Sequence, residues 1–416
     1  MIHIPPSLHH RRFRLLWFGL LISIAGSQMQ LWALFWHIRT ITDQPIALGA
    51  VGLARILPVI VFSLIGGAVA DALNRRRILF LTQTGMALVA LALGWLTLTA
   101  HIDLWHIYLL TALQAVALAF DAPARQALVP NLVPITDLPN AFSLTSIAHQ
   151  AGSIVGPALS GFIIAAGGLP YVYIINAISF LAVVLALVMM GPMEQLNTSP
   201  TRNGVVSRSA IAEGVRFIIK QPLILSTMIL DFFATFFASA NTLMPIIARD
   251  VLGVGAVAYG WLSAAQAIGA IIAAVIISQM HEIRRQGSVF LLAVVVFGLA
   301  TIAFGATRTF LLAMLALVIV GAADTVSTII RNTIRQLATP DHIRGRMTSV
   351  NQIFFQGGPQ LGEVEAGLAA QIFGAPFAVI SGGVGCILAV IWITRRWPQI
   401  RKYNGDEPVM AGTPAV

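Results

Sequence analysis

Four acidic residues and one arginine stand inside long apolar stretches of this sequence: Glu363, Asp231, Glu365, Asp324 and Arg55. An ionisable side chain at membrane depth costs roughly 2.5–3.5 kcal/mol or more, so it is a functional candidate. Carboxylates in such surroundings can take up and release protons. Arg55 is the candidate charge partner, which would neutralise one of them or bind an anionic substrate. A purely structural ion pair is the competing interpretation for Arg55.

The acids differ in their expected roles. Glu363 and Glu365 are two residues apart, so they project from different sides of a helix, and at most one faces a small central site. We rank Glu363 first as the proton carrier, then Asp231, then Glu365. Asp324 is a fourth candidate in the inner half of its segment. Asp121 lies near the end of another apolar stretch, where we expect a solvated side chain.

Polar and aromatic side chains in the apolar stretches are candidates for a substrate path. An aromatic-rich segment follows Asp231, and glutamines accompany tryptophans in the first stretch. The candidates are Gln28, Trp32, Trp36, His149, Gln150 and Phe233. Two alternatives stay open, because aromatic side chains can face lipid and a lone membrane histidine can be a packing residue.

The elements that must position these residues are membrane helices. The 416 residues are 57% apolar and 10% charged, against roughly 45–50% and about 25% in soluble domains. At about 20 residues per crossing, the chain holds a dozen spans. We expect an all-α membrane protein with helices at 13–38, 46–71, 78–100, 104–128, 140–166, 170–191, 222–247, 256–280, 288–306, 309–331, 346–373 and 375–395. The first stretch is too long for a cleaved signal peptide.

The basic residues predict the orientation of these helices. With the N-terminus inside, 21 of the 25 Lys and Arg residues lie in inner segments, four of them in a loop at 331–346. The outer loops keep only Arg39, Arg249 and Arg308. Cytoplasmic loops carry such an excess, so both termini are expected to be cytoplasmic. Because the cations sit in short clusters between apolar runs, the net charge of +9 indicates orientation rather than nucleic-acid binding.

An internal repeat organises the chain. A shift of 206 residues aligns 125–170 with 331–376, and ten of these 46 positions are identical, including Arg125/Arg331 and six Gly or Pro pairs. Such an offset spans six helices and keeps their direction, which predicts two parallel six-helix halves and alternating access between them. The expected domains are a first half at 1–191, a linker with a surface helix at 192–221, a second half at 222–400 and a cytoplasmic tail at 401–416.

The loop from Gly67 to Arg77 resembles the loop signature of the major facilitator superfamily. It keeps Gly67, Asp71, Arg75 and Arg76, but it departs from the family pattern at Ala72 and Asn74. The resemblance implies that this loop is a conformational switch in which Asp71 anchors the interface between the halves. The competing interpretation is that Asp71 is a solvated loop residue and that the arginines only set topology.

A second signature resembles the antiporter motif of the same superfamily. It consists of Gly152, Gly156, Pro157 and Gly161, with Ser160 in place of one glycine. The resemblance implies export. Ordinary small-residue helix packing is the alternative, because the three glycines have equivalents in the second half.

The sequence lacks a phosphate-cradling loop, a nucleophile elbow and a zinc-binding His-Glu-x-x-His helix. We therefore expect a non-enzymatic protein without cofactor or metal. The segment Gly357 to Gly367 is similar to exporters of the enterobactin and macrolide group. This resemblance implies a bacterial inner-membrane exporter of an amphipathic small molecule, a drug or siderophore, driven by proton antiport. The alternatives are an uptake transporter or lysophospholipid flippase on the same fold, and a membrane sensor or scaffold that does not transport.

Overall fold

The computed structural model describes residues 5–191, 215–238, 240–280 and 283–405. Within these ranges the chain forms helices and no strands. Its internal contacts divide it into two compact units. Unit 1 comprises 1–43, 53–205 and 254–264, and unit 2 comprises 44–52, 206–253 and 265–416.

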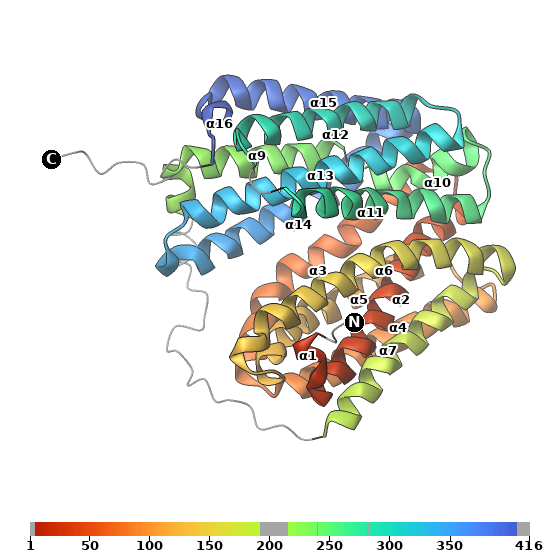
Figure 1. Ribbon diagram of the computed structural model, residues 1–416. Coiled ribbons are helices and arrows are strands. Elements are labelled where there is room, and N and C mark those ends of the chain that lie inside the picture. Colours follow the sequence, from red (N-terminus) through yellow and green to blue (C-terminus); the bar gives the residue numbers. More distant parts are fainter. Residues whose placement is uncertain (1–4, 192–214, 239, 281–282, 406–416) are drawn as a thin grey trace. The chain divides into compact units, whose positions relative to one another are not determined.

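Unit 1 is built from long antiparallel helices joined by short connections (Figure 1). Most of them are long enough to cross a membrane, which needs about 20 residues. They are α1 (Pro6–His9), α2 (Arg11–Ile41), most of α3 (Pro45–Ala72), α4 (Arg75–Leu98), α5 (Leu104–Leu128), η1 (Val129–Asn131), η2 (Ile135–Asp137), α6 (Leu138–Ala166) and α7 (Leu169–Met190). The first turns of α11 (Ala256–Ser278) also belong to unit 1.

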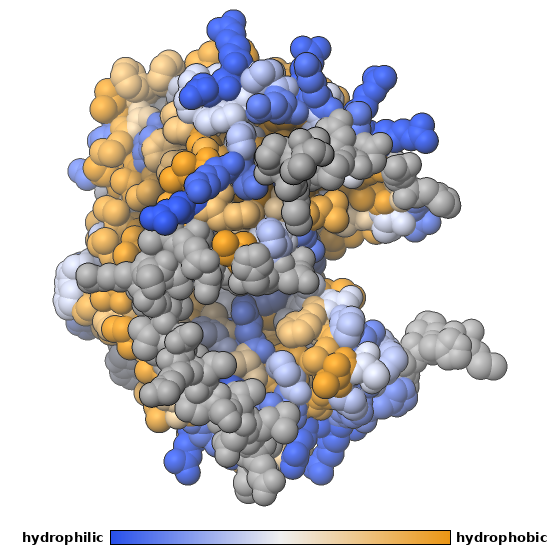
Figure 2. All heavy atoms as spheres, turned by 90° about the vertical axis from the view of Figure 1, so that its left-hand side faces the viewer, coloured by the Kyte–Doolittle hydropathy of each residue, from blue (hydrophilic) through white to orange (hydrophobic). Residues whose placement is uncertain are grey.

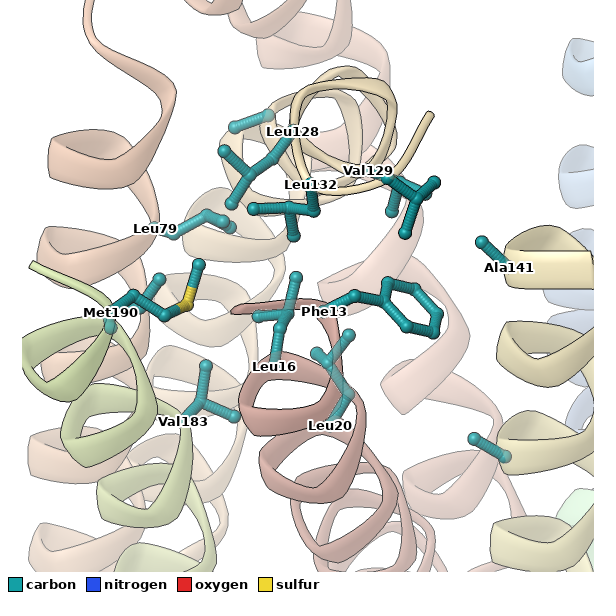
Figure 3. Packing of buried hydrophobic residues seen from close by; sticks show 14 of the residues in the cluster. Phe13, Leu16, Leu20, Leu79, Leu128, Val129, Leu132, Ala141, Val183 and Met190 are labelled. Atoms are coloured by element: carbon teal, nitrogen blue, oxygen red, sulfur yellow. The ribbon is translucent and has the colours of Figure 1, made fainter. Parts of the chain in front are cut away.

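A cluster of buried apolar side chains joins the helices of unit 1 at one end. Phe13, Leu16 and Leu20 of α2 lie between residues of α4 and α7, among them Leu79 and Met190, on one side and Ala141 of α6 on the other, with residues of α5 and η1 at the end of the cluster (Figure 3). In a bilayer, lipid solvates apolar side chains as well as protein does, so close packing rather than hydrophobic burial holds such helices together.

Unit 2 contains the remaining helices and the start of α3. Its elements are α9 (Pro222–Phe237), η3 (Ala240–Leu243), α10 (Met244–Ile246), the π-helix η4 (Ile247–Val251), most of α11, α12 (Gln286–Ala306), α13 (Phe310–Ala338), α14 (Asp341–Phe373), α15 (Ala375–Arg396) and α16 (Gln399–Lys402). Residues 215–220 are also helical, and Ile218 is buried beside Ile224 and Met228 of α9. The rest of the predicted linker, 192–214, lies outside the described residues.

The fold class predicted from composition is confirmed: the protein is an all-α membrane protein. In the described part of the chain, eleven helical segments are long and apolar enough to cross a membrane. The remaining predicted span, 346–373, corresponds to α14, which has 33 residues and is about 50 Å long at 1.5 Å per residue. This helix carries Glu363 and Glu365.

Two boundaries differ from the predicted ones. Helix α9 ends at Phe237, and short helical pieces continue to Val251. The predicted loop at 331–346 is wrong, because helix α13 continues to Ala338 and helix α14 begins at Asp341. Arg331 and Arg335 are both buried. These two arginines therefore are not solvated loop cations, and they belong to the interior of unit 2.

Candidate functional site

A buried ion pair joins α9 to α13 in unit 2. A guanidinium nitrogen of Arg331 lies 2.5 Å from a carboxylate oxygen of Asp231, and both side chains are only 3% exposed. Asp231 stands in the apolar middle of α9, where a single charge is unfavourable. Arg331 supplies the opposite charge from another helix, so each residue offsets the cost of burying the other.

A second carboxylate lies beside the same arginine. Asp324, seven residues earlier on α13, is 3.9 Å from Arg331, and its side chain is 49% exposed. Ser327 accepts a 3.4 Å hydrogen bond from Arg331. Arg331 therefore stands between a buried carboxylate and a half-exposed one. We call Asp231, Asp324 and Arg331 the charge cluster.

A small pocket opens at the charge cluster. It is lined by all three charged residues together with Ala234, Thr235, Val294, Phe297 and Ser327. Its volume of about 10 Å³ is room for roughly one water molecule. Water or a polar group of a ligand in this pocket would meet the carboxylates and the guanidinium together.

Arg335 extends the charge cluster along α13. Its guanidinium donates to the Asn332 side chain at 2.6 Å and to the Asn351 side chain of α14, and it also bonds the carbonyl oxygen of Arg331 at 3.1 Å. Side-chain amides rather than carboxylates hold Arg335, and they fix this turn of α13 beneath Arg331.

Unit 1 has a comparable arginine with a different partner. Arg125, which the repeat aligns with Arg331, pairs with Asp121 one turn earlier on the same helix, α5. Asp121 also accepts hydrogen bonds from Thr82 at 3.0 Å and Gln83 at 2.7 Å, and it is fully buried. The expectation that Asp121 is solvated is therefore wrong. In unit 1 the arginine pairs with Asp121 on its own helix, and Asp121 also accepts hydrogen bonds from α4. In unit 2 Arg331 pairs with an acid on a different helix, α9.

The two acids of α14 occupy different surroundings. Glu363 is buried (6% exposed) and packs against the start of α3 in unit 2, where a Cβ placed on Gly52 would lie 3.1 Å from its carboxylate. Glu365 is half-buried. Arg55 lies less than one turn after Gly52 on α3, in the part of this helix that belongs to unit 1. Glu363 therefore packs against Gly52 of α3 and is not part of the charge cluster.

A buried polar network in unit 1 was missed by the sequence reasoning. Gln30 of α2 donates to Gln114 of α5 at 2.6 Å and accepts from Asn176 of α7 at 2.7 Å. Ser179 donates to the Asn176 side chain at 2.8 Å. The amides satisfy one another, as buried polar groups must. The sequence signal was a glutamine within an apolar helix, but its partners lie more than eighty residues away.

The first-helix candidates lie on either side of this network. The rings of Trp36 and Tyr259 are in contact, tilted by 36° with centroids 4.9 Å apart, and the Tyr259 hydroxyl donates to the Trp32 carbonyl at 2.8 Å. Gln28 lies where α6 packs on α2. The remaining two candidates, His149 and Gln150, are exposed on α6 of unit 1.

The aromatic residues of α9 pack on neighbouring helices of unit 2. Phe233 meets Trp392 of α15 edge-on, and Phe232 meets Phe354 of α14 in the same way, each with centroids 6.0 Å apart. Phe297 of α12, rather than Phe233, lines the pocket at the charge cluster.

The predicted switch loop is a tight turn between α3 and α4. The side chain of Asp71 and the surroundings of Gly67 lie outside the described part of the structure. Asn74, a departure from the family pattern, accepts a hydrogen bond from the Arg77 amide and so caps the start of α4. Arg76 donates to the Leu187 carbonyl at 2.8 Å, in the last turn of α7, where a cation is favoured, and Arg75 is half-buried.

The glycines of the antiporter-like signature pack helices closely. A Cβ on Gly156 would lie 2.6 Å from the Ala25 carbonyl oxygen of α2, and one on Gly161 would lie 3.1 Å from Cα of Gly260 in α11. In unit 2 a Cβ on Gly367, the repeat equivalent of Gly161, would lie 2.9 Å from Cα of Gly49 in α3. Gly49 and Gly260 are each the fifth residue of their helix. These contacts give the signature a packing role in both halves of the repeat, and Gly152 contacts α2 similarly while Pro157 is buried.

Known proteins resemble this chain along nearly its whole length. The profile of the transmembrane secretion effector family matches residues 5–408. An uncharacterised transporter of the major facilitator type, YfiS of Bacillus subtilis, is 27% identical, covering 86% of this chain and 87% of its own. The enterobactin exporter EntS of Citrobacter koseri is 26% identical, covering 84% of this chain and 83% of its own.

Solved structures share the fold at low sequence identity. A bacterial homologue of the human lysosomal transporter Spinster, in an inward-facing and occupied conformation, covers 98% of this chain and 99% of its own with a TM-score of 0.73 and 15% identity. The nucleoside transporter NupG covers 94% of this chain and 99% of its own with a TM-score of 0.66 and 16% identity. The buried charges, the twelve-helix fold and the family match together make this chain a membrane transporter of the transmembrane secretion effector family, within the major facilitator superfamily.

Proposed function

We propose that this transporter exports an amphipathic small molecule, a drug or a siderophore, across the bacterial inner membrane in exchange for protons. The observation that carries the proposal is the charge cluster, in which Asp231 and Asp324 compete for Arg331 at the edge of a pocket. Similarity to the enterobactin exporter EntS supports export and a siderophore-like substrate.

The charge cluster has a route for coupling. When Asp231 is ionised, Arg331 is held at 2.5 Å from it. A proton on Asp231 removes that attraction and leaves Asp324, 3.9 Å away and half-exposed, as the anion nearest to Arg331. Protonation thus transfers the arginine from the buried Asp231 to the half-exposed Asp324, and both carboxylates line the pocket. A polar group that enters the pocket meets a different charge pattern in each protonation state.

The proposal keeps the other acids in defined roles. Glu363 and Glu365 are alternative proton carriers on α14, and Arg55 is the charge partner expected on α3. Arg331 is added to the candidates, because its buried pairing makes it the cation nearest to Asp231.

Transport into inverted membrane vesicles tests the function. Vesicles that contain the protein should accumulate a catecholate siderophore or a lipophilic dye when their lumen is acidified, and a protonophore should abolish this accumulation. Empty vesicles provide the control. Accumulation that ignores the pH gradient would contradict proton antiport, and net movement only in the opposite direction would favour the uptake alternative.

A further inference from the structure

A basic pocket lies at the end of unit 2 that carries α16, apart from the charge cluster. It has a volume of about 500 Å³, within the range of ligand sites, roughly 300–1,000 Å³. Its lining residues are Arg285, Ser288, Pro398, Arg401, Lys402 and Asn404. Three of these six side chains are cations, and no carboxylate is among the described residues that line it.

The chain after α15 folds back on the start of α12 to build this pocket. The Gly287 amide donates to the Tyr403 carbonyl at 3.0 Å, and the Ser288 hydroxyl donates to the Arg401 carbonyl at 3.0 Å. Ile400 and Tyr403 are buried in the core of unit 2. A Cβ on Gly287 would lie 1.6 Å from the Ile400 carbonyl oxygen, so this approach requires glycine. The backbone of the segment is therefore held in place, and Arg401 and Lys402 extend from it as exposed side chains.

The pocket lies at the membrane boundary of two spans. Helix α12 begins at Gln286 and helix α15 ends at Arg396, so the lining residues follow or precede apolar spans by a few residues. Trp392, 49% exposed near the end of α15, is an interfacial anchor by type, and Arg396 lies over the neighbouring ring of Trp397. Hydrophilic side chains project from the unit that carries α16 when it is viewed from this end (Figure 2).

We propose that this pocket binds the phosphate headgroup of an anionic phospholipid. Its cations complement a phosphodiester, the Asn404 amide can donate a further hydrogen bond, and its position at a span boundary matches the depth of headgroups. Clusters of Lys and Arg beside membrane helices attract anionic lipids in this way. The lipid would tie the C-terminal segment to the bilayer surface.

Lipid titration of the purified full-length chain tests the proposal. The unfolding temperature is followed while phosphatidylglycerol, phosphatidylcholine or inorganic phosphate is added in detergent. Phosphatidylglycerol should stabilise the protein, and the other two should not. In the variant Arg285→Gln/Arg401→Gln/Lys402→Gln the half-saturating phosphatidylglycerol concentration should rise roughly tenfold or more, since each cation near an anionic surface contributes severalfold.

A matched variant controls for total charge. Arg11→Gln/Arg12→Gln/Arg14→Gln also removes three exposed cations, in unit 1, and should keep the wild-type titration. An equal rise of the half-saturating phosphatidylglycerol concentration in both variants would overturn the site. An unchanged titration in the pocket variant would also overturn it. Equal stabilisation by inorganic phosphate would overturn the lipid as its ligand. If the triple variant does not fold, Lys402→Gln alone should raise the half-saturating concentration about fivefold, and no change would overturn the site.

Discussion

Removing Arg331 should be more damaging than removing its buried partner. At the observed 2.5 Å separation from Asp231, attraction at an effective dielectric constant of about 20 is about 7 kcal/mol, and for Asp324 at 3.9 Å it is about 4 kcal/mol before solvent screening. The burial of both charges offsets most of this attraction. The net cost of Arg331→Gln, which leaves two carboxylates without their shared cation, should be about 3–5 kcal/mol.

Asp231→Asn should cost less, about 1–3 kcal/mol, because Arg331 keeps Asp324 beside it. The double variant Asp231→Asn/Arg331→Gln should be more stable than the sum of the single losses predicts, since no buried charge of the pair is then uncompensated.

The assay is reversible unfolding of purified protein in mixed micelles with increasing dodecyl sulfate, followed by circular dichroism. Arg308 is exposed in the connection between α12 and α13. The control variant Arg308→Gln should change the free energy of unfolding by less than about 0.5 kcal/mol. The reasoning is refuted if Arg331→Gln is as mild as this control, or if Asp231→Asn is the more damaging single change.

Three further predictions follow from the helices and the loops. Gly156→Ala should destabilise the protein because its Cβ would lie 2.6 Å from a backbone oxygen, whereas Gly85→Ala, with nothing within 4 Å, should be neutral or stabilising; thermal unfolding of both variants checks the contrast. Asp71→Asn should leave expression normal but change transport, and normal transport or a failure to fold would each reject the switch role. A cysteine at Asn203 should resist impermeant thiol reagents in intact cells, since the native cysteine is buried, and rapid labelling from outside would reverse the orientation.

Much of the fold was predictable because each membrane helix is a continuous run of mostly apolar residues in the sequence. Long apolar runs predicted the spans, and Gly follows the last residue of α6, α7 and α14. Helix α13 shows the limit of this reasoning, because Arg331 follows an apolar run and resembles a topology signal. Its burial depends on α9, a hundred residues away, which supplies Asp231. Asp121 was misjudged for the same reason, since its donors come from α4.

The candidate site was predictable in its residue types but not in its pairing. The cost of a charge in an apolar helix singled out Asp231 and Asp324 without any knowledge of the fold. Which cation neutralises them depends on how helices rotate against one another, and local sequence does not encode that. The network around Gln30 has the same origin, because each of its amides lies on a different helix.

Proton coupling through the charge cluster is the central claim, and Asp231→Asn tests it most directly in inverted vesicles. The variant mimics a permanently protonated carboxylate. Exchange of labelled substrate across the membrane should continue, while accumulation driven by a pH gradient should disappear. Glu363→Gln and Glu365→Gln, measured in parallel, identify the carrier if it lies on α14 instead. Full gradient-driven accumulation by Asp231→Asn would contradict the claim, and full accumulation by all three variants would make these acids structural.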